Sequence, residues 1–165
     1  MDLLNLPAGA LCTLVGPPGS GKSTFAAHYP DSWRVCLDVY RRLATDSEAD
    51  QSATPVAAEI QALLLDARLS RGLTTLVDAT NVFAHVRTSL IARARYWQRP
   101  AVAVLFDVPL PTVEAQNAGR DRVVPLHIVR EHHQLLPDAD QLQREGFTAV
   151  HPISELLATP GALRR

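Results

Sequence analysis

The sequence predicts an α/β fold in which a parallel β-sheet of about five strands is flanked by helices. Three features of the 165 residues favour it. Short apolar runs of strand length alternate with segments of helical periodicity. Strands separated by helices require right-handed crossovers, which place the strands parallel in one sheet. The runs are nearly continuous in apolar residues, as in strands that are buried on both faces.

Five runs have the length and composition of buried strands. In chain order they lie at residues 10–15, 33–38, 73–78, 101–106 and 147–150. The first run ends at Gly16, and the next three end at or just before Asp38, Asp78 and Asp107. Ligands of parallel sheets bind beyond the carboxyl ends of the strands, so these residues predict the rim of an active site. The alternative is that each aspartate caps a following helix.

Five segments have helical spacing between these strands. They lie at residues 23–29, 55–71, 84–98, 112–118 and 128–136. The second has the clearest ends, with Thr54 expected as its N-cap, Pro55 at its first position and Gly72 after its last turn. The fourth and fifth helices, with the polar connection between them, predict a small helical lid at about 117–136.

Length and composition predict a single domain over residues 1–165. No apolar run is long enough to cross a bilayer, and the first six residues lack the features of a signal peptide, so we expect a cytoplasmic protein without a membrane partner. Cys12 and Cys36 are expected to be free, buried thiols, with a disulfide as the alternative. The net charge of -1 excludes a broad electrostatic grip on nucleic acid.

Residues 16–24 read Gly-Pro-Pro-Gly-Ser-Gly-Lys-Ser-Thr and match G-x-x-x-x-G-K-[ST]. This pattern follows a predicted strand and opens a predicted helix, which is the context of a phosphate-binding P-loop. The sequence therefore predicts binding of ATP, or another nucleoside triphosphate, with Mg²⁺. The glycines let backbone N–H groups surround the phosphates, the lysine reaches the outer phosphates, and the first hydroxyl binds the metal. The binding residues are Gly16, Gly19, Ser20, Gly21, Lys22, Ser23 and Thr24, with Ser23 on the metal.

Two further groups favour phosphoryl transfer to a hydroxyl. Asp38 and Arg41 are three residues apart, so on a helix start or a turn they share one side. The carboxylate can take a hydroxyl proton and the guanidinium can hold an acceptor phosphate; the alternative is a surface ion pair. Arg120 and Arg122 lie in the polar connection of the lid, where an arginine can neutralise the transferring phosphoryl group; the alternative is a solvated loop.

Asp78, in Asp-Ala-Thr-Asn at the end of the third expected strand, has the position of a carboxylate that holds Mg²⁺ directly or through water. A turn or capping role is the alternative. Among the aromatic residues, Tyr40 and Phe83 are candidates for stacking on one base, although packing suits both better.

Together these motifs resemble the kinase domain of polynucleotide 5′-hydroxyl kinases of the bacteriophage and bacterial type. The resemblance extends in pieces from about residue 11 to about residue 136. Its pieces are residues 16–24, D-x-x-R at 38–41, D-x-T-N at 78–81, F-D-V-P at 106–109, N-x-x-R at 117–120, and segments at 124–125 and 128–130.

The resemblance implies transfer of the γ-phosphate of ATP, or a related triphosphate, to the 5′-OH end of RNA or DNA. By position, Asp38 is implied to be the general base and Arg41 to engage the phosphate next to that hydroxyl. Lys22 and Arg120 are implied to clamp the transition state, and Asp78 to support the metal. A few arginines would form a funnel for the strand end. The candidates are Arg41, Arg42, Arg120, Arg122 and Arg130.

The sequence departs from this family's pattern at Gln116, where members often carry an arginine. We therefore expect Arg122, or a residue elsewhere in the chain, to supply part of the grip on the triphosphate. A phosphatase motif and a ligase lysine are both missing from the sequence, which predicts separate phosphatase or ligase partners. Two other functions remain open from the residues: a P-loop kinase of a small-molecule hydroxyl, such as a nucleoside, sugar acid or antibiotic, and a nucleotide-binding regulator without transfer.

Overall fold

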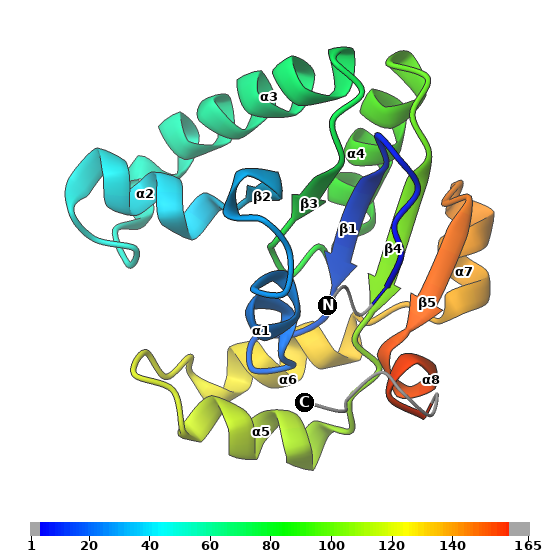
Figure 1. Cartoon of the computed structure of the whole chain (residues 1–165). Coiled ribbons are helices and arrows are strands. Elements are labelled where there is room, and N and C mark those ends of the chain that lie inside the picture. The colour runs from blue at the N-terminus through cyan, green and yellow to red at the C-terminus, as the bar shows by residue number, and fades with distance from the viewer. Residues whose placement is uncertain (1–3, 159–165) are drawn as a thin grey trace.

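The computed structural model describes residues 4–158, and it has the predicted α/β architecture. Its five strands form one sheet in the order β2-β3-β1-β4-β5, and every neighbouring pair is parallel. The strand arrows all point toward α1, α5 and α6 (Figure 1). The strands are β1 (Leu11–Val15), β2 (Arg34–Val35), β3 (Thr75–Val77), β4 (Ala101–Leu105) and β5 (Ala149–Pro152).

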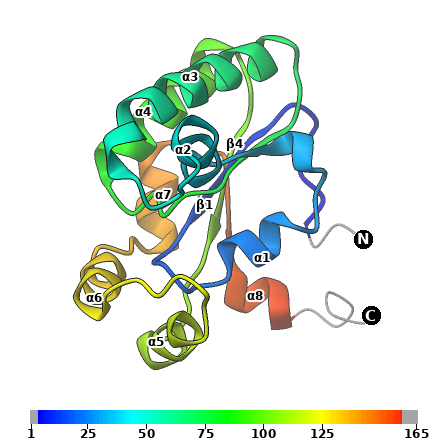
Figure 2. The same ribbon diagram turned by 90° about the vertical axis from the view of Figure 1, so that its left-hand side faces the viewer.

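Helices cover both faces of the sheet, as parallel strands require (Figure 2). One face packs on α3, α4 and α7 through buried residues such as Leu65, Leu90 and Leu142. The other packs on α1 and α8 through Phe25 and Ile153. The helices are α1 (Lys22–Ala26), α2 (Leu37–Thr45), α3 (Thr54–Ser70), α4 (Ala84–Tyr96), α5 (Leu110–Ala118), α6 (Leu126–Gln134), α7 (Ala139–Glu145) and α8 (Ile153–Ala158).

The second expected strand is much shorter than the run at 33–38. Strand β2 lies at the sheet edge and pairs with β3 over two residues, Arg34 with Leu76 and Val35 with Val77. The chain then enters α2 at Leu37, so Asp38 lies in the first turn of a helix and not at the end of a strand. An edge strand has one neighbour to pair with, and β3 itself is short, which explains the early stop.

Two other expectations are also wrong, namely the N-cap at Thr54 and the place of Asp107 on the active-site rim. Thr54 is the first residue of α3, and Ala53 is its N-cap, because a 3₁₀ turn at Gln51–Ala53 already leads into the helix. Asp107 caps the distant helix α8: its Oδ1 accepts a hydrogen bond from the Ser154 N–H at 3.0 Å, and its Oδ2 accepts one from the Ser154 hydroxyl. It therefore does not line the cleft described below.

Other expectations at the residue level are confirmed. Cys12 and Cys36 are free and buried. Gly72 follows the end of α3 with a φ of 68°, and its N–H donates to the Leu69 carbonyl at 3.0 Å. The sequence had not indicated the short helices α7 and α8. A buried Arg87 joins α4 to α7 by donating to Glu145 from Nε and Nη2, each at 2.7 Å.

Candidate active site

The phosphate loop, residues 16–21, joins β1 to α1 at the carboxyl edge of the sheet (Figure 1). Gly19 and Gly21 have φ angles of 85° and 95°, which residues with a Cβ rarely adopt. A Cβ at Gly19 would also lie 2.8 Å from the carbonyl oxygen of Val113 in α5. Glycine is therefore needed both for the turn and for the close packing of α5 on the loop.

Lys22 is buried at the start of α1 and folds back over the loop. Its ammonium donates to the Pro17 carbonyl at 2.7 Å and lies 3.4 Å from the Ser20 hydroxyl. Burial and the charge of Arg120, partly offset by Asp78, lower the pKa of Lys22 to about 8. An anion bound in the loop would favour the charged ammonium, because opposite charges stabilise each other strongly away from water.

The pair of oxygen atoms from Ser23 and Asp78 is the feature that can hold a metal. Ser23 Oγ lies 3.5 Å from Asp78 Oδ1. Arg34 binds the other oxygen of this buried carboxylate, with Nε at 2.7 Å and Nη2 at 2.6 Å. Within residues 4–158 no group of three or more His, Cys, Asp or Glu residues is placed to hold a metal. One hydroxyl and one carboxylate oxygen fit Mg²⁺, which takes its other ligands from phosphates and water.

Asp38 and Arg41 face each other in α2, as their spacing predicts. Arg41 Nη2 pairs with Asp38 Oδ1, and Arg41 Nε donates to the Glu48 carbonyl at 2.9 Å. The Arg41 side chain is 9 % exposed, whereas the Asp38 side chain is 46 % exposed. A guanidinium this buried is not part of a solvated surface pair. It fixes the orientation of a carboxylate that remains open to the cleft.

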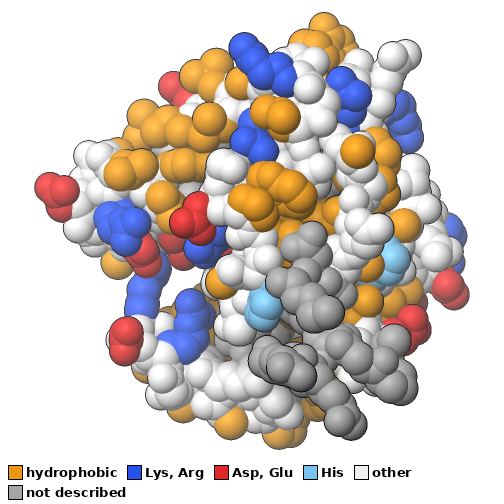
Figure 3. Space-filling model, in the orientation of Figure 1, with side chains coloured by type: hydrophobic (Ala, Val, Ile, Leu, Met, Phe, Trp, Pro, Cys, Tyr) orange, Lys and Arg blue, Asp and Glu red, His pale blue; other side chains and the backbone are white. Residues whose placement is uncertain are grey.

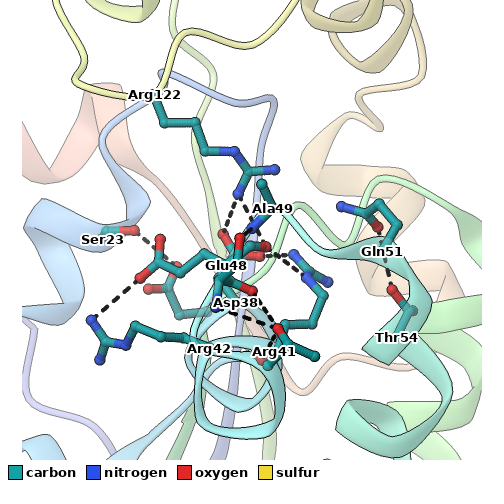
Figure 4. A network of polar contacts seen from close by, with 12 residues as sticks. Ser23, Asp38, Arg41, Arg42, Glu48, Ala49, Gln51, Thr54 and Arg122 are labelled. Carbon is teal, nitrogen blue, oxygen red and sulfur yellow. Dashed lines mark hydrogen bonds and ion pairs between the residues drawn. The ribbon is translucent and has the colours of Figure 1, made fainter.

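Two more arginines surround Glu48, and together with Arg41 they form an arginine cluster (Figure 4). Arg42 Nη1 lies 3.5 Å from Glu48 Oε1. Arg122 reaches across from the loop between α5 and α6, with Nη1 at 3.4 Å from the Glu48 carbonyl and 3.9 Å from Asp38 Oδ2. The arginine cluster, defined as Arg41, Arg42 and Arg122, therefore joins α2 to the lid.

Helices α5 and α6 lie where the lid is predicted, and Asn117 holds the loop between them. The Asn117 side chain is fully buried. It donates to the Val124 carbonyl at 2.8 Å and accepts from the Val124 N–H at 3.1 Å. These bonds close the loop that carries Arg120 and Arg122. The lid is held at two places. Helix α5 packs on Gly19 of the phosphate loop, and Asn117 binds Val124 in the loop between α5 and α6.

A cleft of about 1390 Å³ separates α2 from the lid and runs along the phosphate loop. Figure 3 shows this hollow, with Lys and Arg side chains on its rim. The predicted catalytic, nucleotide-binding and metal-binding residues line it, with Gly16 as the exception. Gly16 is the first residue of the loop and lies behind the cleft wall, where its N–H donates to the Thr80 carbonyl at 2.9 Å.

Three other candidates have packing or surface roles. Tyr40 is buried in the core beneath α2. The ring of Phe83 lies 5.5 Å from the ring of His132, in a perpendicular contact. Arg130 pairs with Glu114 at 2.6 Å and does not line the cleft, so it is no part of the expected funnel. Of these three, none presents a free stacking face or charge to the cleft.

Two residues of the site had not been singled out from the sequence. Arg34 binds Asp78 from the edge strand β2, and Glu48 brings the three arginines of the cluster together. Arg34 carries a weak signal, since a charged residue in an apolar run needs a buried partner. Glu48 carries none, because two of its contacts use a backbone carbonyl that any residue would supply.

A family model described as AAA domain matches residues 11–138, which is most of the chain. The chain belongs to this AAA domain family. The phosphate loop, the strands β1 to β4 and helices α5 and α6 lie in the matched part of the chain, and β5 follows it. The AAA domain has the fold and nucleotide-binding loop of a P-loop kinase, and phosphoryl transfer of the P-loop kinase type is the activity that this fold supports. A search of curated proteins finds no match to this chain.

Solved structures share this fold. A chain of the Pnkp1/Rnl/Hen1 RNA repair complex is similar with a TM-score of 0.69 and 24 % identity, over 87 % of this chain and 47 % of that one. A gluconokinase from Sinorhizobium meliloti 1021 aligns with a TM-score of 0.52 and 14 % identity, over 89 % and 83 %. Kti12 from Chaetomium thermophilum, in complex with ADP-AlF3, has a TM-score of 0.56 and 12 % identity, over 86 % and 87 %. The present AAA domain thus spans about half of the repair-complex chain.

Proposed function

We propose that this protein is a polynucleotide 5′-hydroxyl kinase, which transfers the γ-phosphate of ATP or another nucleoside triphosphate to a 5′-OH end of RNA or DNA. The observation that carries the proposal is the position of Asp38. Its carboxylate opens into the cleft that also contains Lys22 and the phosphate loop, and Arg41 fixes its orientation. Transfer to a hydroxyl needs a base and a phosphate cradle that face the same space.

On the donor side, the backbone N–H groups of the phosphate loop bind the triphosphate. Lys22 leaves the Pro17 carbonyl and pairs with the outer phosphates, and Arg120 approaches from the lid. Both cations stabilise the charge that develops on the transferring phosphoryl group. Ser23 and Asp78 would hold Mg²⁺, which supplies further charge neutralisation when bound.

On the acceptor side, Asp38 accepts the proton of the 5′-hydroxyl as the hydroxyl oxygen attacks the γ-phosphorus. The bond from the γ-phosphorus to the β–γ bridging oxygen breaks, and the nucleoside diphosphate leaves with that oxygen. Arg41 keeps the carboxylate pointed into the cleft throughout this step. The strand that carries the hydroxyl is anionic, and the arginine cluster offers it cations at the mouth of the cleft. A terminal nucleotide or two can be held in this way, which agrees with the low net charge of the chain.

Two observations support nucleic acid as the acceptor. The motif set at residues 16–24, 38–41, 78–81 and 117–120 lines or supports one cleft, and the chain of the RNA repair complex has the same fold. We also propose that a separate phosphatase or ligase completes end repair.

No helix in residues 4–158 is long and apolar enough to span a membrane.

A second candidate is a kinase of a small-molecule hydroxyl. The gluconokinase aligns over 83 % of its own length, whereas the repair-complex chain aligns over 47 %. In that case Asp38 would still be the base, and the arginine cluster would hold an anionic group of the metabolite.

The test is transfer of labelled γ-phosphate from ATP and Mg²⁺ to matched 5′-OH oligonucleotides of RNA and DNA. Lys22→Ala is the negative control, and 5′-phosphorylated oligonucleotides exclude labelling at other positions. We expect label on the 5′-OH strands with the wild-type protein alone. The ratio of RNA to DNA labelling identifies the preferred acceptor.

Absence of label, with ATP binding confirmed by calorimetry, would contradict the proposal. Sugar acids, nucleosides and aminoglycosides would then be screened by ADP release. Turnover of one of them supports the second candidate. ATP binding without any acceptor-dependent ADP release would indicate a nucleotide-binding regulator.

A further inference from the structure

The two arginines of the lid loop both line the cleft and have different neighbours there. Arg120 lines the cleft near Lys22, where its charge acts on the buried ammonium. Arg122 extends across the cleft toward α2, where it contacts Asp38 and Glu48 (Figure 4). Only one residue separates the two in sequence, yet Arg120 acts on Lys22 and Arg122 contacts α2 and the loop after it. The lid can therefore contact donor and acceptor with different residues.

The cation nearest to Asp38 is already committed within the protein. Arg41 uses Nη2 for Asp38 and Nε for the Glu48 carbonyl, and it is buried. These two contacts hold the guanidinium in place, and an acceptor phosphate that bound it through the same nitrogens would disturb the base. Arg122 is a second cation that touches the same carboxylate, and it can bind an anionic acceptor without disturbing the contacts of Arg41.

The contacts of Arg122 are weak enough to be exchanged. Its Nη1 lies 3.9 Å from Asp38 Oδ2, and both side chains are almost half exposed, at 44 % and 46 %. Exposed ion pairs of this kind contribute little, because water and salt screen them. A phosphate oxygen accepts shorter, bidentate hydrogen bonds from a guanidinium. An incoming phosphate can thus replace Asp38 as the partner of Arg122.

We propose that Arg122 binds an internucleotide phosphate of the acceptor strand, and does not bind the nucleoside triphosphate. The proposal rests on the polynucleotide kinase function given above. Before the acceptor arrives, Arg122 bridges the lid to Asp38 and to the Glu48 carbonyl. When the acceptor phosphate takes over the guanidinium, Asp38 Oδ2 becomes free to accept the hydroxyl proton. Binding of the correct acceptor and release of the base are then one event.

The closing experiment separates donor binding from acceptor binding. Calorimetry gives the Kd of ATP without acceptor, and initial rates at saturating ATP give the KM of a 5′-OH oligonucleotide. We expect Arg122→Ala to raise the acceptor KM about 10- to 100-fold, the usual weight of a charge-assisted hydrogen bond, and to leave the Kd of ATP within about twofold. Arg122→Lys restores part of the loss, because an ammonium keeps the charge without the bidentate geometry.

Two comparison variants bracket this result. Arg120→Ala weakens the donor side and raises the Kd of ATP. Arg71→Ala removes an exposed arginine whose guanidinium donates to Ala67 in α3, away from the cleft, and controls for the loss of one charge. An Arg122→Ala protein with a raised Kd of ATP, or with an unchanged acceptor KM, overturns the proposal.

Acceptors with a neutral methylphosphonate at the first or the second internucleotide linkage identify the contact. Neutralising the linkage that Arg122 binds should raise the acceptor KM of the wild type. It should raise the acceptor KM of Arg122→Ala only a little further, since the same contact cannot be lost twice. If both methylphosphonates raise the acceptor KM of Arg122→Ala by the same factor as that of the wild type, the proposal is overturned. If the wild type labels no oligonucleotide, the polynucleotide function fails. The Kd of ATP then still decides whether Arg122 belongs to the donor side.

Discussion

The donor side of the cleft is one continuous segment, whereas the acceptor side is assembled from parts that are distant in the sequence. Residues 16–24 form the phosphate loop and the start of α1, and backbone groups make most of its cradle. The acceptor side takes Asp38 and Arg41 from α2, Glu48 from the following loop, and Arg122 from the lid. Its contacts are made by arginine side chains, of which Arg41 is buried and Arg122 is partly exposed.

This difference follows from the two ligands. Every nucleoside triphosphate presents the same phosphates, which a backbone nest fixed by β1 and α5 can bind without adjusting. Acceptors differ in shape, and flexible arginines at a cleft mouth can follow them at an entropic cost. The comparison predicts that donor-side changes affect ATP binding and all transfer, while acceptor-side changes leave ATP binding intact.

Lys22→Ala should have the largest effect, with transfer reduced at least about 10³-fold, because it removes a buried cation from the developing charge. ATP binding weakens as well, which calorimetry measures. Arg71→Ala, on the outer surface of α3, should behave as wild type. Transfer retained within tenfold would show that the loop backbone alone suffices on the donor side.

Asp38→Asn should have the next largest effect, and it acts on the acceptor side. The amide preserves the shape of the side chain but cannot take a proton, so kcat should fall about 10²- to 10⁴-fold. The Kd of ATP should stay within about twofold, because Asp38 contacts Arg41 and Arg122 and not the phosphate loop. Normal turnover by Asp38→Asn would remove Asp38 as the base.

Asn117→Ala should affect both sides moderately, since Asn117 holds the loop that carries both lid arginines. The loss leaves the backbone N–H and carbonyl of Val124 without their partner, at about 1–3 kcal/mol of unfolding free energy. Thermal unfolding measures this, with the exposed Gln134→Ala in α6 as control. Kinetics should show both a higher acceptor KM and a lower kcat. A change in the acceptor KM alone, or in kcat alone, would contradict the inference that Asn117 holds both arginines.

The smallest expected effect is proton uptake on ATP binding. The pKa of Lys22 is lowered to about 8 in the free protein, and a bound triphosphate favours the charged ammonium. Above pH 8 the free protein has mostly lost this proton and must regain it, so affinity falls as pH rises. Calorimetry in buffers of different ionisation enthalpy should give roughly half to one proton at pH 8.5 and close to none at pH 6.5. Lys22→Arg should show no uptake at either pH, because arginine stays protonated.

The sequence alone was enough to predict the parallel sheet, the phosphate loop and the two helices α5 and α6. The phosphate loop is predictable because its pattern is contiguous in the sequence. Position 19 requires glycine, because its positive φ and the close approach of α5 exclude a Cβ. The apolar runs are predictable because a strand buried on both faces cannot carry many polar residues. Asp38 and Arg41 were paired correctly by spacing, although the predicted strand end proved to be a helix start.

Only the tertiary structure decided which partners meet across the cleft. Arg34 reaches Asp78 because β2 lies beside β3, and Arg122 reaches Asp38 because α5 packs on the phosphate loop and Asn117 closes the lid. Asp107, like Asp78, directly follows an apolar strand run, yet it caps α8. The order of the strands in the sheet determines which elements surround each strand end. Local patterns fix backbone geometry within a few residues. Contacts between distant side chains depend on how the crossovers bring the helices together, and no short pattern encodes that.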